Sequence, residues 1–134
     1  MRHKFYVCEF VNKKFTTPPG KVFVKFGVTH HMDVMNRFNS DINDGYTKNY
    51  NDWNIVCKFS IICPTRQHAE QIERYWLECK YPYKSKYKVW VEQVLGIQDK
   101  YYYNNSTGIT ELRLLDKSEA KNVYMMLHRL KKEM

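Results

Sequence analysis

The sequence predicts one α/β (α+β) domain, with a small central and mainly antiparallel sheet flanked by helices. Three observations predict this fold class. Runs of β-branched and aromatic residues near the N-terminus and in the middle of the chain are typical of strands. Three segments repeat apolar residues at helical spacing. The chain has 134 residues, of which 43% are hydrophobic, and this is enough for one ordinary domain with its own core.

The first half of the chain predicts two strands, a short helix and a third strand. Residues 4–11 and 21–28 are rich in β-branched and aromatic side chains, and the Pro- and Gly-containing stretch between them predicts a hairpin with a longish loop. Residues 32–42 repeat apolar side chains at helical spacing. A polar loop over residues 43–52 then leads to a strand over residues 53–62.

A second helix is predicted to open at Pro64 and Thr65 and to end at Pro82, which cannot continue it. Its regular apolar spacing predicts one buried face. The residues of that face are Ala69, Ile72, Trp76 and Cys79.

The C-terminal third is expected to extend a core of residues 1–85 by residues 86–134. Residues 86–97 fit a strand or a helix, and residues 100–115 predict a hairpin. Asp116 followed by Glu119 makes a capping pair for a last helix. The predicted buried face of that helix consists of Ala120, Val123, Tyr124, Leu127 and Leu130.

The charge balance indicates a polyanionic partner. There are 22 Lys and Arg residues against 14 Asp and Glu, a formal net charge of +8. Such a surplus points to nucleic acid or an anionic membrane surface, and the alternative is charge that serves only solubility. The N-terminal apolar run is too short for a signal peptide, and no segment approaches the ~20 apolar residues of a membrane span. We therefore expect a cytoplasmic protein with no membrane partner.

The four cysteines form no C-x-x-C pair and no zinc-binding pattern. Disulfides stay open as an alternative. The simpler interpretation is buried free thiols in a reducing cytosol.

The segment 74–90 interleaves cations with aromatic residues such as Tyr81. Cations neutralise phosphates, and aromatic faces stack on bases at ~1–3 kcal/mol per base. This pattern predicts a nucleic-acid surface, although Trp76 is expected in the core; the alternative is that all the aromatics are buried and the lysines only solvated. The candidate binding residues are Arg74, Lys80, Tyr83, Lys84, Lys86 and Lys88.

Glu73 and the turn after residue 28 carry the other candidate groups. Glu73 falls at the edge of the buried stripe of its helix, where a carboxylate needs a partner or a metal. A structural salt bridge to Arg37 and a functional role are equally compatible with this position. Gly27 would allow close approach of a ligand to the backbone, and His30 and His31 followed by Arg37 would suit acid/base work and phosphate binding. Histidine pairs in loops are more often plain surface residues.

These features together resemble the GIY-YIG endonuclease superfamily. The two triplets of the opening hairpin are Lys4-Phe5-Tyr6 and Lys25-Phe26-Gly27, and the arginine on the following helix is Arg37. The helix pattern A-x-x-x-E is matched by residues 69–73, and the lysine-rich stretch after it by residues 80–83. Lysine replaces the tyrosine of the second triplet, and the first triplet keeps only its tyrosine.

Late in the chain, residues 108–111 (Gly-Ile-Thr-Glu) are similar to a stretch found in phage-type members. The richness in Asn, Lys and Tyr fits a viral or phage source. The resemblance covers about residues 4–84.

The resemblance implies roles for named residues. Glu73 would hold one Mg²⁺ (or Mn²⁺), which would polarise the scissile phosphate. Arg37 would neutralise charge developing on that phosphate. Tyr6 would activate or position a water, with Lys25 as its partner. His31 or its neighbour His30 would assist.

Three hypotheses follow. The first is a metal-dependent endonuclease that cuts DNA or, less readily, RNA. The second is a catalytically silent relative that only binds nucleic acid in a regulatory role. The third is a protein-interaction domain whose basic face meets an acidic partner.

Overall fold

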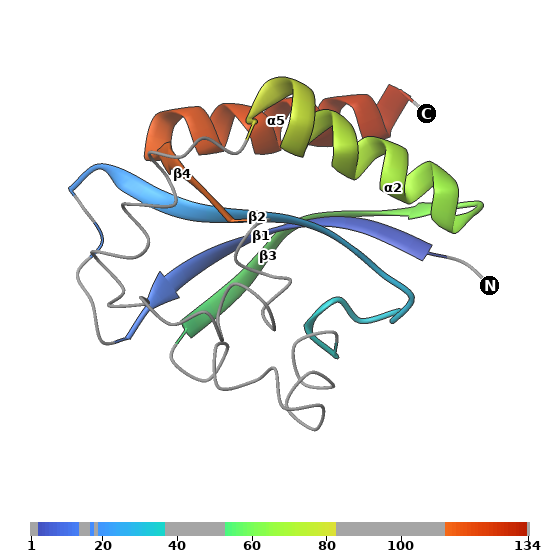
Figure 1. The fold of residues 1–134 in the computed structure, drawn as a ribbon, viewed down its shortest axis with the longest axis horizontal. Helices are drawn as coiled ribbons and strands as arrows, with labels where there is room; N and C mark the ends of the chain where they lie inside the picture. Colours follow the sequence, from blue (N-terminus) through green and yellow to red (C-terminus); the bar gives the residue numbers. More distant parts are fainter. Residues whose placement is uncertain (1–2, 14–16, 18, 37–52, 83–111, 134) are drawn as a thin grey trace.

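A four-stranded antiparallel sheet forms the centre of the computed structural model, which describes residues 3–13, 17, 19–36, 53–82 and 112–133. The strand order is β3-β1-β2-β4. Two helical elements lie side by side on one face of this sheet (Figure 1). The predicted α+β class and the mainly antiparallel sheet are therefore confirmed.

The opening hairpin consists of β1 (His3–Asn12) and β2 (Lys21–Thr29). Both strands extend slightly beyond the predicted ranges. Thr29 of β2 still pairs with Lys4 of β1, and the end residues of β1, His3 and Asn12, pair with the third strand of the sheet. Gly20 precedes β2 with a φ of 75°, a left-handed conformation that glycine adopts without the steric cost of a Cβ. The predicted hairpin is confirmed.

Strand β3 (Trp53–Cys63) pairs with the other edge of β1 and contains a β-bulge. Val7 pairs with Phe59 and Cys8 pairs with Cys57, so Lys58 is an extra residue on β3. A bulge of this kind bends the strand and changes how its side chains alternate.

The sheet separates two apolar clusters. The helix-covered face contains Phe5 and Val7 of β1 together with the buried side chains of the helices. We call the other side the second face, and it carries Tyr6, Cys8 and Phe10 of the same strand. Successive residues of a strand point to opposite faces, so the alternation of β1 builds both clusters at once.

The helix after β3 begins as α2 (Arg66–Arg74) and continues as the π-helix η1 (Tyr75–Lys80). Thr65 caps its N-terminus, and its hydroxyl accepts a hydrogen bond from the His68 backbone N–H at 3.2 Å. Ala69 and Trp76 are buried as predicted, but Cys79 is exposed.

The error at Cys79 comes from the wider winding of the last turn. In a π-helix hydrogen bonds run from residue i to i+5, and the Tyr81 N–H donates to the Trp76 carbonyl at 2.8 Å. The residue that continues the buried face is consequently Tyr81. Its ring stacks on Trp76 with centroids 6.1 Å apart.

The chain returns as β4 (Leu112–Asp116), which pairs with β2, and ends in α5 (Lys117–Glu133). The helix starts directly after Asp116, whose carboxylate lies 2.7 Å from the Lys21 ammonium. Three of the predicted core residues are buried, namely Ala120, Val123 and Leu127. Tyr124 is half-buried, and Leu130 is 48% exposed, so its predicted burial is wrong. It lies at the distal end of the helix, beyond the core.

The predicted helix over residues 32–42 lies mostly outside the described residues. Its start is later than expected, because Asp33 accepts a hydrogen bond from the Met35 N–H at 3.0 Å and helical backbone begins at Met35. Met32 precedes this cap and is 56% exposed. The loop over 43–52, the ambiguous segment 86–97 and the first part of the predicted hairpin over 100–115 also lie outside the described residues.

Candidate functional site

Tyr6 and Lys25 form a close pair on the second face of the sheet. Tyr6 lies on β1 and Lys25 on β2, and the Lys25 ammonium nitrogen is 5.9 Å from the centroid of the Tyr6 ring. Each side chain is only 1% exposed. A buried cation beside a phenol ring is favourably placed for a cation–π contact. The structure thus brings together the two hairpin residues to which the sequence assigned catalytic roles.

Gly27 makes room for this pair. Tyr6 is paired directly with Gly27, and a Cβ built on Gly27 would lie 2.4 Å from both Cζ and the hydroxyl oxygen of Tyr6. No real Cβ comes so close to a ring, so a side chain at position 27 would displace the phenol. The group that approaches this glycine closely is therefore a side chain of the protein itself, whereas the sequence suggested a ligand.

Glu73 lies across the sheet from Tyr6 and Lys25. It belongs to α2, which packs on the helix-covered face through Ala69 and Ile72. With 3.6 residues per turn, Glu73 projects about 40° from Ala69, on the side away from Ile72. Its side chain is half-buried and makes at least one polar or electrostatic interaction. The described residues therefore place the candidate metal ligand and the candidate tyrosine on opposite faces.

The outer edge of β2 is covered by another strand over only part of its length. Strand β4 pairs with β2 only from Lys21 to Lys25. Within the described ranges no strand pairs with the outer edge of β2 beyond Lys25. This unpaired edge runs from Gly27 to the end of the strand at Thr29. Ile72 lies on the side of α2 that faces α5, so the flank that carries Glu73 is turned away from α5.

The turn that follows β2 is tied back to the sheet. Thr29 accepts a hydrogen bond from the His31 backbone N–H at 3.1 Å, and the Lys4 ammonium donates to the Met32 carbonyl. His31 is half-buried, and its ring centroid lies 4.2 Å from that of His30. Arg37, the predicted phosphate-binding residue, lies outside the described residues.

The predicted nucleic-acid segment is only partly described. Arg74 and Lys80 are exposed, as a phosphate-binding role requires. Tyr83, Lys84, Lys86 and Lys88 lie outside the described residues. Tyr81 packs in the core with Phe26, to which its ring centroid lies at 6.0 Å. It is therefore unavailable for stacking on a base, and this part of the prediction is corrected.

A basic stripe on α5 was not identified from the sequence. Six of its side chains line one shallow groove along the helix: Lys121, Tyr124, Met125, His128, Arg129 and Lys132. The His128 ring also contacts the Lys58 carbonyl on β3 at 2.9 Å. The four basic residues recur at helical spacing (i, i+7, i+8, i+11), which places them on one face. That spacing is a signal present in the sequence, beside the apolar spacing that predicts the buried face of the same helix.

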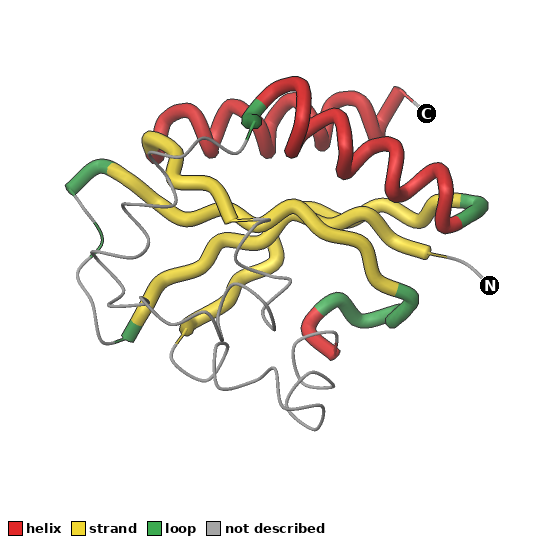
Figure 2. Tube along the Cα trace, viewed as in Figure 1, coloured by secondary structure: helices red, strands yellow, loops and turns green. Residues whose placement is uncertain are grey.

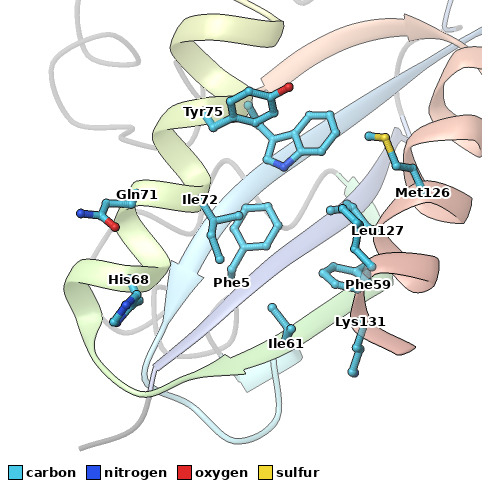
Figure 3. A pocket seen from close by; sticks show the side chains of 12 residues that line it. Phe5, Phe59, Ile61, His68, Gln71, Ile72, Tyr75, Met126, Leu127 and Lys131 are labelled. Atoms are coloured by element: carbon cyan, nitrogen blue, oxygen red, sulfur yellow. The ribbon is translucent and has the colours of Figure 1, made fainter. Parts of the chain in front are cut away.

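An apolar groove of about 510 Å³ separates α2 from α5 on the helix-covered face. Figure 3 shows Phe5, Ile72 and Leu127 converging on it from β1, α2 and α5. Lys131 lies at one end, where its ammonium donates to the Ser60 carbonyl at 2.7 Å. The volume falls in the range of small-ligand pockets, and most of the lining is apolar, with Lys131, His68 and Gln71 as its polar members.

Arg113 of β4 is a buried cation that sequence reasoning also missed. It is 2% exposed, and its guanidinium donates to the backbone carbonyl of Tyr81 at 2.6 Å and to that of Leu77 at 3.2 Å. Since Leu77 belongs to η1 and Tyr81 follows it, Arg113 binds the carbonyls left free at the end of that helix.

Two features are absent from the residues that the structure describes. No group of three or more His, Cys, Asp or Glu side chains is clustered there in a way that could hold a metal ion. None of the described helices has the length and apolar character needed to span a membrane. No protein-family model, no curated protein and no solved structure matches the chain.

Proposed function

We propose that this protein is an endonuclease of the GIY-YIG type, which hydrolyses phosphodiester bonds in DNA with the help of a divalent metal ion. One observation carries the proposal. The Tyr6 phenol lies directly over Gly27 and beside Lys25, so the two triplets of the opening hairpin supply a phenol and an amine to a single place. Neither a surface hairpin nor an ordinary core strand requires a buried lysine at this position.

The proposed substrate site is the outer edge of β2 between Gly27 and Thr29. In this proposal Tyr6 and Lys25 would contribute to the site from the second face. His31 follows the strand, and Glu73 would contribute from the flank of α2. Arg37 is proposed to bind the phosphate. A phosphodiester bound at this edge would lie between the groups of the two faces.

The residues present fit a metal held mainly by substrate and water. Glu73 is a half-buried carboxylate, and within the described ranges no metal-binding cluster of three side chains accompanies it. Mg²⁺ commonly binds through one or two carboxylates and keeps several waters, with substrate phosphate completing its shell. When bound, the ion would polarise the phosphate and stabilise the leaving oxygen.

A plasmid-nicking assay with Mg²⁺ tests the proposal. Glu73→Gln should lower the nicking rate by about 100-fold or more, because it removes the carboxylate charge while keeping the shape. Tyr6→Phe should lower it by a similar factor, since it removes only the hydroxyl and preserves the ring over Gly27. Glu78→Gln is the matched control: Glu78 is an exposed carboxylate of η1, and its loss should leave the rate unchanged.

Nicking by the wild type that persists in EDTA, or nicking by Glu73→Gln at the wild-type rate, would contradict the proposal. A circular dichroism spectrum of each variant separates lost chemistry from lost fold.

A second candidate is a relative that binds nucleic acid without cutting it. It is favoured by the near-complete burial of Tyr6 and Lys25 and by the position of Glu73 on the opposite face of the sheet. Under this alternative, wild type and Glu73→Gln bind DNA equally and neither nicks it with any divalent metal. A gel-shift titration run beside the nicking assay distinguishes the two candidates.

A further inference from the structure

Two cysteines and a lysine lie in one row across the second face of the sheet. Cys57 of β3 pairs with Cys8 of β1, and Cys8 pairs in turn with Lys25 of β2. Directly opposed side chains on antiparallel strands have Cβ atoms about 4.5–5.5 Å apart. The two thiols are therefore direct neighbours, and both belong to the apolar cluster of the second face.

The two thiols differ in their access to solvent. Cys8 has no exposed surface, whereas Cys57 is half-buried. Cys57 is thus the thiol that a small reagent reaches first, and Cys8 stands behind it as an enclosed second thiol. This asymmetry is the one expected of a reacting cysteine paired with a resolving cysteine.

Their surroundings also shift the pKa values of the two thiols in opposite directions. A hydrogen bond from Cys8, together with the Lys4 ammonium, lowers the pKa of Cys57 from 9.0 to about 7, although burial and Asp33 oppose the shift. The pKa of Cys8 is raised, because it holds its proton for the Cys57 sulfur and is buried, against a smaller opposing effect of Lys25. Near neutral pH, about half of Cys57 is therefore thiolate, the nucleophilic form.

We propose that Cys57 is a peroxide-reactive thiol that forms a reversible disulfide with Cys8, linking β3 to β1. This site is independent of the proposed nuclease activity. Cys57 is the thiol attacked, and Cys8 is the thiol that completes the bond.

The chemistry balances with hydrogen peroxide as the oxidant. The Cys57 thiolate attacks one peroxide oxygen, the O–O bond breaks, and Cys57 sulfenic acid and hydroxide are formed. The Cys8 sulfur then attacks the Cys57 sulfur and forms the S–S bond. The sulfenic oxygen leaves with the proton of Cys8 as water. Two electrons pass from the thiols to peroxide, and two equivalents of a small thiol reverse the reaction by exchange.

The geometry favours a labile disulfide over a permanent structural one. The Cβ atoms of a disulfide are about 3.8 Å apart, so the opposed cysteines must approach each other more closely than an unlinked strand pair does. The bulge at Lys58 interrupts the regular ladder beside Cys57, so the pairing of β3 with β1 is already irregular there. Bonds that retain strain are reduced more easily.

The experiment uses the full reduced chain and hydrogen peroxide at pH 7. We expect the free thiols of Cys8 and Cys57 to disappear together. The intact mass should fall by two hydrogen atoms. A digest made without reductant should contain a peptide pair linked through Cys8 and Cys57. Dithiothreitol should restore both thiols. Cys79→Ser, which removes a different exposed thiol, should give the same product.

Two variants and one rate complete the test. Cys8→Ala should leave Cys57 as a sulfenic acid that a cyclic dione traps, and Cys57→Ser should leave Cys8 reduced. Iodoacetamide at pH 7 should modify Cys57 about three times faster than the thiol of a small peptide with a pKa of ~8.5. Cys57 would hold about 15-fold more thiolate than that peptide, and its lower intrinsic nucleophilicity would reduce the advantage about fivefold.

Three results would overturn the proposal in the wild-type chain itself, whatever the folding of the variants. The first is a disulfide that joins Cys63 or Cys79 instead. The second is a Cys57 sulfenic acid that persists beside a reduced Cys8. The third is no loss of either thiol while Cys79 is oxidised.

Discussion

The phenol of Tyr6 occupies the space in which residue 27 would otherwise carry a side chain. Gly27→Ala would place a Cβ 2.4 Å from the ring, and Tyr6 is too deeply buried to swing away freely. We expect this substitution to lower the free energy of unfolding by about 1–3 kcal/mol, the usual cost of overpacking a core. Urea unfolding followed by circular dichroism measures it. The loss should shrink in a Tyr6→Leu background, because the obstructing ring is absent there. Additive losses in the double variant would show that the close contact is not the cause.

At the scale of elements, the end of η1 is held by β4. The Arg113 guanidinium donates to two carbonyls at that end and to its neighbour Leu112 at 2.9 Å. Arg113→Lys should lower the free energy of unfolding by about 2–4 kcal/mol, since an ammonium cannot reproduce the planar fork and leaves buried carbonyls without donors. Guanidinium unfolding checks the value. Arg66→Lys is the matched control: Arg66 pairs with Glu70 on the exposed surface of α2, where ion pairs contribute little. Equal effects of the two substitutions would remove the structural role assigned to Arg113.

At the scale of the whole molecule, a net charge of +8 predicts that DNA binding weakens as salt rises, and the stripe on α5 predicts where the phosphates lie. Arg129→Glu should weaken binding for all DNA sequences alike and reduce the slope of log K against log salt by about 0.9, because one phosphate is no longer neutralised. Lys13→Glu changes the charge equally on the exposed residue that follows β1, away from the stripe, and should leave that slope unchanged. Fluorescence anisotropy over a salt series gives both slopes. If the two variants behave identically, only the overall charge matters and the stripe is no specific surface.

Local patterns in the sequence were sufficient to predict the first three strands, the start of the second helix near Thr65 and most of the buried face of α5. Their physical basis is short-range: alternation along a strand and helical spacing. Cys79 and Leu130 were misplaced because burial also depends on how a helix winds and on where the core ends. The spacing of apolar residues predicts neither the winding of the helix nor the extent of the core.

The candidate site was predictable to a smaller degree. The proximity of Tyr6 and Lys25 follows from the hairpin, whose register brings nearby residues of two strands together. The face on which Glu73 lies depends on where α2 packs, and this is decided by contacts distant in sequence such as that of Trp76 with Phe26, whose ring centroids are 5.5 Å apart. The role of Arg113 likewise depends on carbonyls more than thirty residues earlier, which no local pattern contains.

Because of the bulge in β3, the odd-numbered residues of its two halves lie on opposite faces of the sheet. On the N-terminal side of Lys58, the odd-numbered residues Trp53, Ile55 and Cys57 belong to the cluster of Tyr6; on its C-terminal side, the odd-numbered residues Phe59, Ile61 and Cys63 belong to the cluster under the helices. Figure 2 shows the backbone of the sheet in yellow, with α2 and α5 in red on one side of it.

Removing Lys58 would join Cys57 directly to Phe59, and ordinary alternation along a strand would then keep each residue on the face that it occupies now. Trp53 would stay beside Phe10 and Phe23, and Phe59 would stay beside Phe5. The strand is therefore expected to serve both clusters without its extra residue, and the bulge adds a local bend rather than the division between two cores.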